Sequence, residues 1–257
     1  MNDLKNKKAF ICDMDGVIYH GNKLLNGVVA FVDWLHDENK EYLFLTNSSE
    51  RSPTELCQKL QRLGIEVPKE RFYTSALATA NFLNSQCEGG SAYVIGDSGL
   101  TNALYEVGFT MNDVNPDYVV VGETRTYNFE KIEKAVHLVL KGAKLIGTNP
   151  DLTGPTEKGL VPATRALIAP IELSTGRQAY YVGKPNPLMM RHARKKLGVT
   201  SAETAIIGDR MDTDIIAGIE SGMDTVLVLS GVTTEEMLIN FPYRPTYILN
   251  GVGDVIS

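Results

Sequence analysis

Short apolar runs alternate along the chain with longer segments in which apolar residues recur every three or four positions. The apolar runs predict strands at residues 8–13, 41–46, 92–96, 117–122, 143–147, 179–183, 204–208 and 224–229. The helical spacing predicts helices at residues 26–38, 53–63, 75–86, 98–107, 128–141, 187–197 and 212–221. This alternation is typical of βαβ units, so we expect an α/β fold built on a parallel sheet.

One expected helix carries clear signals at both ends. Ser52 stands at the N-cap position and Pro53 at the first helical position, where a missing N–H costs nothing. Leu56 and Leu60 follow at helical spacing, and Gly64 suits the turn that ends a helix. The sequence therefore sets the bounds of this helix without any tertiary information.

No low-complexity linker divides the chain. The segments at 85–91 and 174–178 are the most flexible-looking joints, and a self-sufficient set of strands and helices lies between them. We therefore expect residues 79–179 to form an inserted α/β domain. Residues 1–78 and 180–257 would then build one sheet together.

Net charge and the number of cysteines limit the binding partners and the cellular compartment to be expected. The 257 residues carry a formal net charge of −6, which disfavours nucleic acid but leaves a small anionic substrate, such as a small phosphorylated metabolite, open, because one site can be locally positive. No apolar run approaches the roughly 18 residues that cross a bilayer, so we expect no membrane. Cys12, Cys57 and Cys87 form neither a disulfide nor a zinc pattern, which favours the reducing cytoplasm. The oligomeric state is left open.

The first expected strand ends in two carboxylates, Asp13 and Asp15, followed by Gly16. Ligands of an open parallel sheet bind beyond the carboxyl ends of its strands. Two close carboxylates repel unless a cation lies between them, so one suits nucleophilic attack and the other general acid–base work. The alternative is a strand-end turn in which Asp and Gly are only turn residues.

Two later strand ends carry groups that suit a phosphate. Thr46 and Asn47 end the strand at 41–46, where a hydroxyl and backbone N–H groups can hold phosphate oxygens. Lys184 follows the strand at 179–183 and can neutralise a phosphate or an aspartate pair. The alternatives are a capping turn for the first pair and a solvated surface charge for the lysine.

A last acidic group follows the strand at 204–208. Asp209 comes directly after Gly208, and Asp212 and Asp214 begin the next helix. Magnesium prefers hard oxygen ligands, and one or two carboxylates suffice because it keeps several waters. The alternative for the later pair is stabilisation of a helix N-terminus, and the Gly-Asp pair at 96–97 shows that this dipeptide occurs twice after a strand.

Four segments in this order, "DMDG", "TN", "GKP" and "GDRMDTD", resemble the motifs of the haloacid dehalogenase (HAD) superfamily of phosphatases. The long gap between the second and third resembles the cap of the NagD-type (class IIA) subfamily, and "NPDYVVVGETRTYN" is similar to the nucleotide phosphatases of that subfamily. The resemblance covers about residues 8–250. It implies a Rossmann-like core with an inserted C2-type α/β cap.

The resemblance also implies roles for four acidic residues around a Mg²⁺ cofactor. Asp13 is the nucleophile and a metal ligand. Asp15 is the general acid and base, and it binds the metal through its backbone carbonyl. Asp209 is a metal ligand, and Asp214 holds the metal ligands in place without binding the metal itself.

Three further residues bind the phosphoryl group in the resemblance. Thr46 and Asn47 hold its oxygens, and Lys184 neutralises both Asp13 and the phosphate. The implied function is a magnesium-dependent phosphatase that hydrolyses small phosphomonoesters through an aspartyl-phosphate. Nucleoside monophosphates such as UMP are the first substrate class, and sugar phosphates are the second. The alternatives are a phosphotransferase or a non-catalytic module that binds phosphometabolites.

Two positions depart from the family pattern. Ser48 stands where relatives often have Asn, and Arg165 stands where they usually have a small residue. Arg165 either pairs with a second anionic group of the substrate or faces solvent. We expect substrate specificity to lie in the loops at 149–151 and 162–165.

Overall fold

The computed structural model describes residues 2–156 and 159–257. Contacts within the chain divide it into two compact units. The first, here called the core unit, comprises the residues up to Thr46, Leu56–Tyr73 and Lys184–Ser257. The second, the cap unit, comprises Asn47–Glu55 and Thr74–Gly183.

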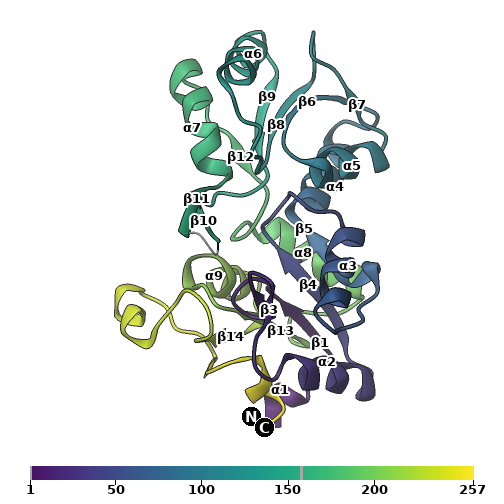
Figure 1. Cartoon of the computed structure of the whole chain (residues 1–257), viewed down its shortest axis with the longest axis vertical. Helices are drawn as coiled ribbons and strands as arrows, with labels where there is room; N and C mark the ends of the chain where they lie inside the picture. The colour runs from purple at the N-terminus through teal and green to yellow at the C-terminus, as the bar shows by residue number, and fades with distance from the viewer. Residues whose placement is uncertain (1, 157–158) are drawn as a thin grey trace. The chain divides into compact units, whose positions relative to one another are not determined.

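The core unit is built on a six-stranded sheet of order β15-β14-β13-β1-β4-β5 (Figure 1). Its strands are β1 (Ala9–Cys12), β4 (Glu41–Thr46), β5 (Phe72–Thr74), β13 (Thr204–Gly208), β14 (Asp224–Val228) and β15 (Tyr247–Leu249). The central strand β1 pairs in parallel with both β13 and β4. All four residues of β1 are buried, which explains why its sequence is apolar without alternation.

Helices cover this sheet. They are α1 (Asn2–Lys5), α2 (Val28–Asp37), α3 (Pro53–Arg62), α8 (Pro187–Leu197) and α9 (Ile216–Glu220). Shorter elements are η1 (Lys69–Arg71), the π-helical turn η2 (Met211–Ile215), η3 (Glu235–Asn240), η4 (Val252–Val255) and the ribbon of β2 (Tyr19–His20) with β3 (Lys23–Leu24).

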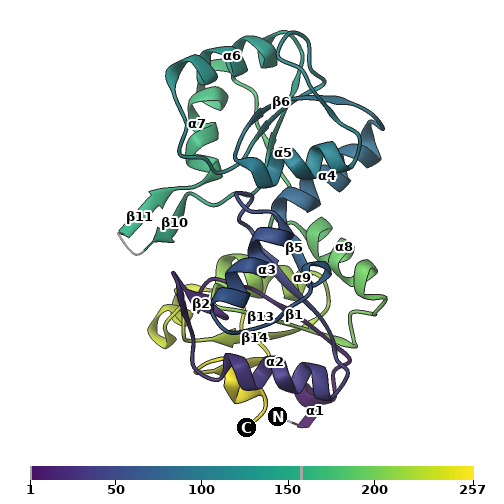
Figure 2. The same cartoon turned by 45° about the vertical axis from the view of Figure 1, so that its right-hand side comes forward.

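An aromatic cluster fixes α2 on the sheet. Phe10 of β1 meets Phe31 and Trp34 of α2 edge to face, with ring centroids 6.1 and 5.4 Å apart. The two chain ends lie together beside α1 (Figure 2), where the Lys5 ammonium donates to the carbonyl of Ile256 at 3.1 Å. Residues from both ends of the chain therefore build the core unit.

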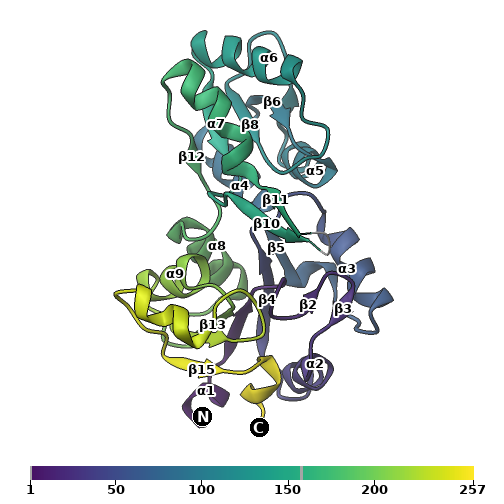
Figure 3. The ribbon, with the colours of Figure 1, turned by 60° about the vertical axis from the view of Figure 1, so that its left-hand side comes forward.

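The cap unit has its own parallel sheet of five strands, in the order β12-β9-β8-β6-β7. They are β6 (Ser91–Ile95), β7 (Thr110–Met111), β8 (Tyr118–Val121), β9 (Lys144–Gly147) and β12 (Tyr180–Tyr181). Its helices are α4 (Ser75–Gln86), α5 (Ser98–Glu106), α6 (Phe129–Leu140) and α7 (Thr164–Thr175). Helices α6 and α7 pack on one face, with Leu138 and Ile168 buried against Val119 of β8. A hairpin of β10 (Thr153–Thr156) and β11 (Gly159–Pro162) precedes α7 (Figure 3).

The expected α/β fold with parallel sheets is confirmed. The helices expected at 75–86 and 187–197 have those bounds, and Ser52 caps α3 by accepting from the N–H of Glu55 at 3.3 Å. Helix α7 was not expected from the sequence. It holds Pro170 in its interior, a residue that normally ends a helix.

The helix expected at 212–221 is two elements, the π-helical turn η2 and then α9. The units change at Tyr73–Thr74 and at Gly183–Lys184, and the segment 47–55 groups with the cap unit. Strand β12 pairs with β9, so it belongs to the sheet of the cap unit. An inserted domain with bounds at 79 and 179 stays a prediction. Among the described residues, no helix combines the length and the apolar character needed to span a membrane.

Candidate active site

Three neighbouring strands of the core unit end in polar side chains. Asp13 follows β1, and its N–H donates to the carbonyl of Ile207 in β13 at 2.8 Å. Asp209 follows β13, and Thr46 is the buried last residue of β4 on the other side of β1. Because parallel strands end at one edge, the sheet brings these three residues to the same edge.

Lys184 lies between two of the carboxylates. Its ammonium nitrogen is 2.5 Å from Oδ1 of Asp13 and 2.6 Å from Oδ1 of Asp214, and its side chain is only 3% exposed. Burial alone would lower the pKa of Lys184, but the two carboxylates outweigh burial and raise the pKa above its ordinary value. Lys184 is therefore a fixed positive charge, unlike a solvated surface lysine.

Asp13, Asp209 and Asp214 form a compact carboxylate cluster, with one oxygen of each within 4.8 Å of the others. Burial raises the pKa of Asp13 well above its ordinary range, against the lowering effect of Lys184. Burial and the neighbouring Asp214 raise the pKa of Asp209 to about 7. Both shifts reflect too little positive charge for three carboxylates of which two are buried and Asp13 is partly buried.

Glycines make room for this cluster. A Cβ atom added at Gly208 would lie 2.1 Å from Cβ of Asp214. At Gly231 or Gly16 it would lie 2.0 or 2.4 Å from Oδ2 of Asp209. Gly16 also has a φ of +81°, which favours glycine. Gly231 was not foreseen from the sequence, because nothing in "LSGV" marks a residue that approaches a carboxylate.

The donor set fits a divalent cation. Three ionised carboxylates and one ammonium leave a formal charge of two negative units (3 − 1 = 2) in a buried site. Carboxylate oxygens are hard ligands of the kind that magnesium binds. The N–H of Val232 donates to Oδ2 of Asp209 at 2.7 Å, which orients this carboxylate.

Asp15 and Asp212 lie outside the carboxylate cluster. The Asp15 side chain is exposed, in a turn closed by a hydrogen bond from the N–H of Gly16 to the carbonyl of Tyr19 at 2.9 Å. Asp212 is exposed and pairs with Arg210 at 2.8 Å, so it is a surface ion pair. Of the two acidic residues that begin the segment after Arg210, only Asp214 joins the cluster.

Asn47 belongs to the cap unit, although it directly follows Thr46. Its amide nitrogen donates to Oδ2 of Asp151 at 3.0 Å. Its carbonyl accepts from the hydroxyl of Ser75 at 2.5 Å and from the amide of Asn149 at 2.7 Å. Within the core unit, the structure therefore brings together Asp13, Lys184, Asp209 and Asp214 but not Asn47.

A polar network in the cap unit was not foreseen from the sequence. Oε2 of Glu123 accepts from the N–H of Ser49 at 3.1 Å, and its Oε1 accepts from the amide of Asn149 at 2.5 Å. The hydroxyl of Thr148 donates to that of Ser49 at 3.2 Å. The network holds the segment 47–55 against the ends of β8 and β9. No local signal in "GETRT" points to this role.

The two positions that depart from the family pattern are now placed. The hydroxyl of Ser48 accepts from the N–H of Glu50 at 3.4 Å. The Arg165 side chain is exposed, while its N–H donates to the carbonyl of Asp151 at 3.0 Å. This hydrogen bond connects the two predicted specificity loops, and the N–H of Ala163 donates to the carbonyl of Leu152, next to the first loop, at 3.0 Å.

Comparison with known proteins identifies the class that the fold and the lysine–carboxylate site define. A haloacid dehalogenase-like hydrolase model matches residues 10–110, and a HAD-hydrolase-like model matches residues 181–255. With close relatives along almost its whole length, the chain belongs to the haloacid dehalogenase-like hydrolases. It is an enzyme, a phosphatase of this family.

Three relatives are phosphatases by name. The chain is 47% identical over 247 residues to the dihydroxyacetone phosphatase of Corynebacterium glutamicum (strain R), covering 96% of this chain and 90% of that one. It is 44% identical over 248 residues to the ribonucleotide monophosphatase NagD of Escherichia coli (strain K12), covering 96% and 98%. It is 39% identical over 255 residues to the acid sugar phosphatase of Staphylococcus aureus (strain USA300), covering 99% and 98%. The solved structure of NagD from E. coli matches with a TM-score of 0.91 over 97% of this chain and 98% of that one.

Proposed function

We propose that the chain is a magnesium-dependent phosphatase that hydrolyses small phosphomonoesters through a covalent aspartyl-phosphate. The observation that carries the proposal is Lys184 bound between Asp13 and Asp214, with Asp209 completing a buried carboxylate cluster. A buried surplus of negative charge suits a bound cation, and a fixed lysine suits an anionic substrate.

In the first half of the reaction, a carboxylate oxygen of Asp13 attacks phosphorus. The bond between phosphorus and the ester oxygen breaks, and its electron pair stays on that oxygen, which takes a proton from Asp15. Lys184 orients Asp13, and their 2.5 Å contact favours the carboxylate over the acid, which opposes the effect of burial on the pKa of Asp13.

In the second half, water attacks the phosphorus of the aspartyl-phosphate. Asp15 accepts a proton from this water, and the bond between phosphorus and the Asp13 oxygen breaks to return the carboxylate and release phosphate. The exposed position of Asp15 suits a group that exchanges protons with an incoming alcohol or water. Thr46 and Asn47 would hold phosphoryl oxygens.

Asp13 and Asp209 would hold Mg²⁺ directly, together with the backbone carbonyl of Asp15, and Asp214 would support them through Lys184. When bound, the cation neutralises charge on the transferred phosphoryl group. Asp13, Asp209 and Asp214 supply oxygen atoms within 4.8 Å of one another, which fits this assignment.

Nucleoside monophosphates such as UMP are the first proposed substrate class, and sugar phosphates are the second. The named activities of the relatives cover a ribonucleotide monophosphate, an acid sugar phosphate and dihydroxyacetone phosphate, all small phosphomonoesters. The connected loops at 149–151 and 162–165 would choose among them, with Arg165 exposed on the second loop. Replacing Arg165 by Ala should change the ratio of kcat/KM between UMP and sugar phosphates.

The experiment that tests the proposal is phosphate release from a panel of phosphomonoesters, with Mg²⁺ and with EDTA. The panel holds nucleoside monophosphates, sugar phosphates and p-nitrophenyl phosphate. We expect turnover that needs Mg²⁺ and that Asp13→Asn lowers by at least roughly a thousandfold, because the nucleophile is lost. Turnover by Asp13→Asn at the wild-type rate would show that the nucleophile is assigned wrongly.

Asp212→Asn is the matched control. Asp212 lies in the same acidic segment as Asp214, but it is exposed and pairs with Arg210. We expect this variant to keep its activity within about twofold, since an exposed ion pair contributes little. A loss as large as that of Asp13→Asn would mean that the acidic segment as a whole acts in catalysis.

A further inference from the structure

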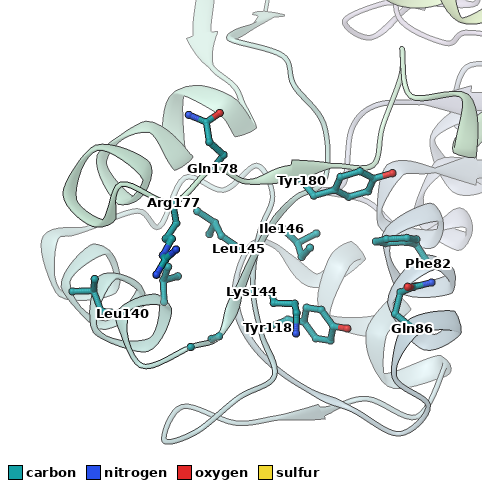
Figure 4. Close-up of a pocket in the computed structure, with 13 residues that line it drawn as sticks. Phe82, Gln86, Tyr118, Leu140, Lys144, Leu145, Ile146, Arg177, Gln178 and Tyr180 are labelled. Atoms are coloured by element: carbon teal, nitrogen blue, oxygen red, sulfur yellow. The ribbon is translucent and has the colours of Figure 1, made fainter.

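A cavity of about 690 Å³ opens in the cap unit at the starting ends of its strands (Figure 4). Tyr118 begins β8, Lys144 begins β9 and Tyr180 begins β12. Glu123 and Asn149 lie beyond the opposite ends of β8 and β9. None of the residues proposed for hydrolysis lines this cavity.

The cavity has an apolar floor and a polar rim. Tyr118, Leu145 and Ile146 form buried parts of its lining, each less than a tenth exposed. The exposed side chains of Lys144 and Arg177 stand at its edge. A concave site with an apolar base and a few polar groups is the usual form of a small-molecule site, and the volume lies within the usual range of roughly 300–1,000 Å³.

The charge of the lining selects an anion. Lys144 and Arg177 are its two cations, and no carboxylate is found among the described residues that line it. The Arg177 guanidinium has no carboxylate within ion-pair distance in the part of the chain that the structure describes. The nearby Asp117 accepts from the hydroxyl of Ser91 at 2.8 Å and interacts electrostatically with Lys144, so Arg177 is the main positive charge of the lining. On a chain of net charge −6, this is a locally positive concave surface.

An aromatic pair stands on the other side of the cavity. The rings of Phe82 and Tyr180 have centroids 5.1 Å apart and planes at 32°, and Tyr180 is 45% exposed. Figure 4 shows both rings on the side away from Arg177, with Gln86 next to Phe82. An exposed aromatic ring offers a face on which a planar heterocycle stacks, as bases do on proteins that bind single strands.

We propose that this cavity binds a small anion that carries an aromatic ring, the chemistry of a nucleotide. The ring would stack on Phe82 and Tyr180, and the anionic group would lie toward Arg177 and Lys144. The amide of Gln86 can both donate to and accept from ring nitrogens and exocyclic groups. The cavity is a second binding site, in the cap unit and apart from the carboxylate cluster.

The test uses cyclic AMP, which carries one negative charge and an aromatic base. Because it is a phosphodiester, a phosphomonoesterase is not expected to hydrolyse it. Titration calorimetry of the full chain at low salt should show one bound equivalent. Adenosine, which lacks the anion, and sulfate, which lacks the ring, should each bind at least about tenfold more weakly, because each keeps only half of the contacts. Equal binding of sulfate and cyclic AMP would overturn the aromatic part of the proposal.

Arg177→Gln should weaken the binding of cyclic AMP about tenfold, because one charged hydrogen bond is lost. Lys141→Gln is the matched control, since it removes an exposed cation next to the cavity that is not part of its lining. We expect Lys141→Gln to stay within about twofold of wild type. Equal losses in both variants would mean that only the general charge of the surface attracts the anion.

Amide chemical shifts locate the bound molecule. We expect cyclic AMP to shift the signals of Gly142, Lys144 and Gln178 in the wild-type chain. Shifts confined to Asp13, Thr46 and their neighbours would place the molecule at the proposed hydrolytic site and overturn the proposal. No binding by calorimetry or by chemical shift would overturn it as well.

Discussion

A β-branched residue followed by Ile-Gly-Asp ends a strand in each unit, and the two aspartates have different roles. In the cap unit "VIGD" ends β6, and Asp97 leads into α5, its carbonyl accepting from the N–H of Leu100 at 3.2 Å. In the core unit "IIGD" ends β13, and Asp209 is only 2% exposed, within the carboxylate cluster. Both aspartates follow a parallel strand, so local structure does not separate them.

The neighbouring strand ends make the difference. Next to β13, β1 ends at the partly buried Asp13, and this carboxylate lies close to those of Asp209 and Asp214, with Lys184 paired to Asp13 and Asp214. Next to β6, β8 leads to Glu123. Its carboxylate accepts hydrogen bonds from Ser49 and Asn149. An edge with unbalanced charge is suited to bind a cation and a phosphate, while an edge with satisfied hydrogen bonds holds the chain together.

The largest expected effect separates the two Gly-Asp pairs directly. Asp209→Asn should lower magnesium-dependent phosphate release on the order of 1000-fold, because a proposed metal ligand worth several kcal/mol of charge stabilisation is lost. Asp97→Asn should stay within about twofold of wild type. Steady-state phosphate release with increasing Mg²⁺ measures the activity of both variants. Similar losses in the two variants would show that the two aspartates do not differ in role.

Stability against pH tests the unbalanced charge of the core unit. The pKa of Asp209 is raised to about 7 in the folded chain, while an unfolded Asp titrates near pH 4. Between these values the folded state holds a proton that the unfolded chain has released, so stability without metal should fall as the pH rises from about 4 to about 7. The expected loss is on the order of 2–4 kcal/mol.

Magnesium should replace that proton, so its stabilising effect should grow across the same pH window. Thermal unfolding at a series of pH values, with EDTA and with Mg²⁺, measures both trends. Asp209→Asn should flatten the metal-free profile because the titrating group is gone. A metal-free stability that rises from pH 4 to pH 7 would contradict an excess of negative charge in the carboxylate cluster.

Loss of the Glu123 hydrogen bonds at the strand ends of the cap unit should lower the free energy of unfolding. Glu123→Ala leaves the N–H of Ser49 and the amide of Asn149 without this acceptor, which should cost about 1–3 kcal/mol of unfolding free energy. Glu133→Ala, an exposed position on α6, should stay within about 0.5 kcal/mol. Urea unfolding compares them, and equal stabilities would remove the structural role assigned to Glu123.

The smallest effect should be the same in both units. Asn128 caps α6 in the cap unit and Asn186 caps α8 in the core unit, each accepting from a backbone N–H at 3.0 Å. Each change to Ala should cost about 1 kcal/mol in thermal unfolding. A much larger loss in one unit would show that the two units differ in their helix ends as well as in their strand ends.

Local physical chemistry made much of the fold readable from the sequence. Buried parallel strands read as continuous apolar runs, so β1, β4 and β13 were found within one or two residues. Helix α3 was readable because Ser52 and Pro53 act through their immediate neighbours. Helix α7 was not, because packing of Ile168 and Ile171 in the core outweighs the local penalty of Pro170.

The amino-acid pattern alone shows that carboxylates, a hydroxyl and a lysine follow predicted strands of parallel sheets, which is enough to propose a site and a chemistry. Which of these groups meet depends on how the strands are ordered and packed. The tertiary structure buries Lys184 between Asp13 and Asp214, leaves Asp212 at the surface, and places Asn47 with Asp151 in the cap unit. Strand order and the close approach of Gly231 to Asp209 depend on residues far apart in the chain, and no local pattern encodes such contacts.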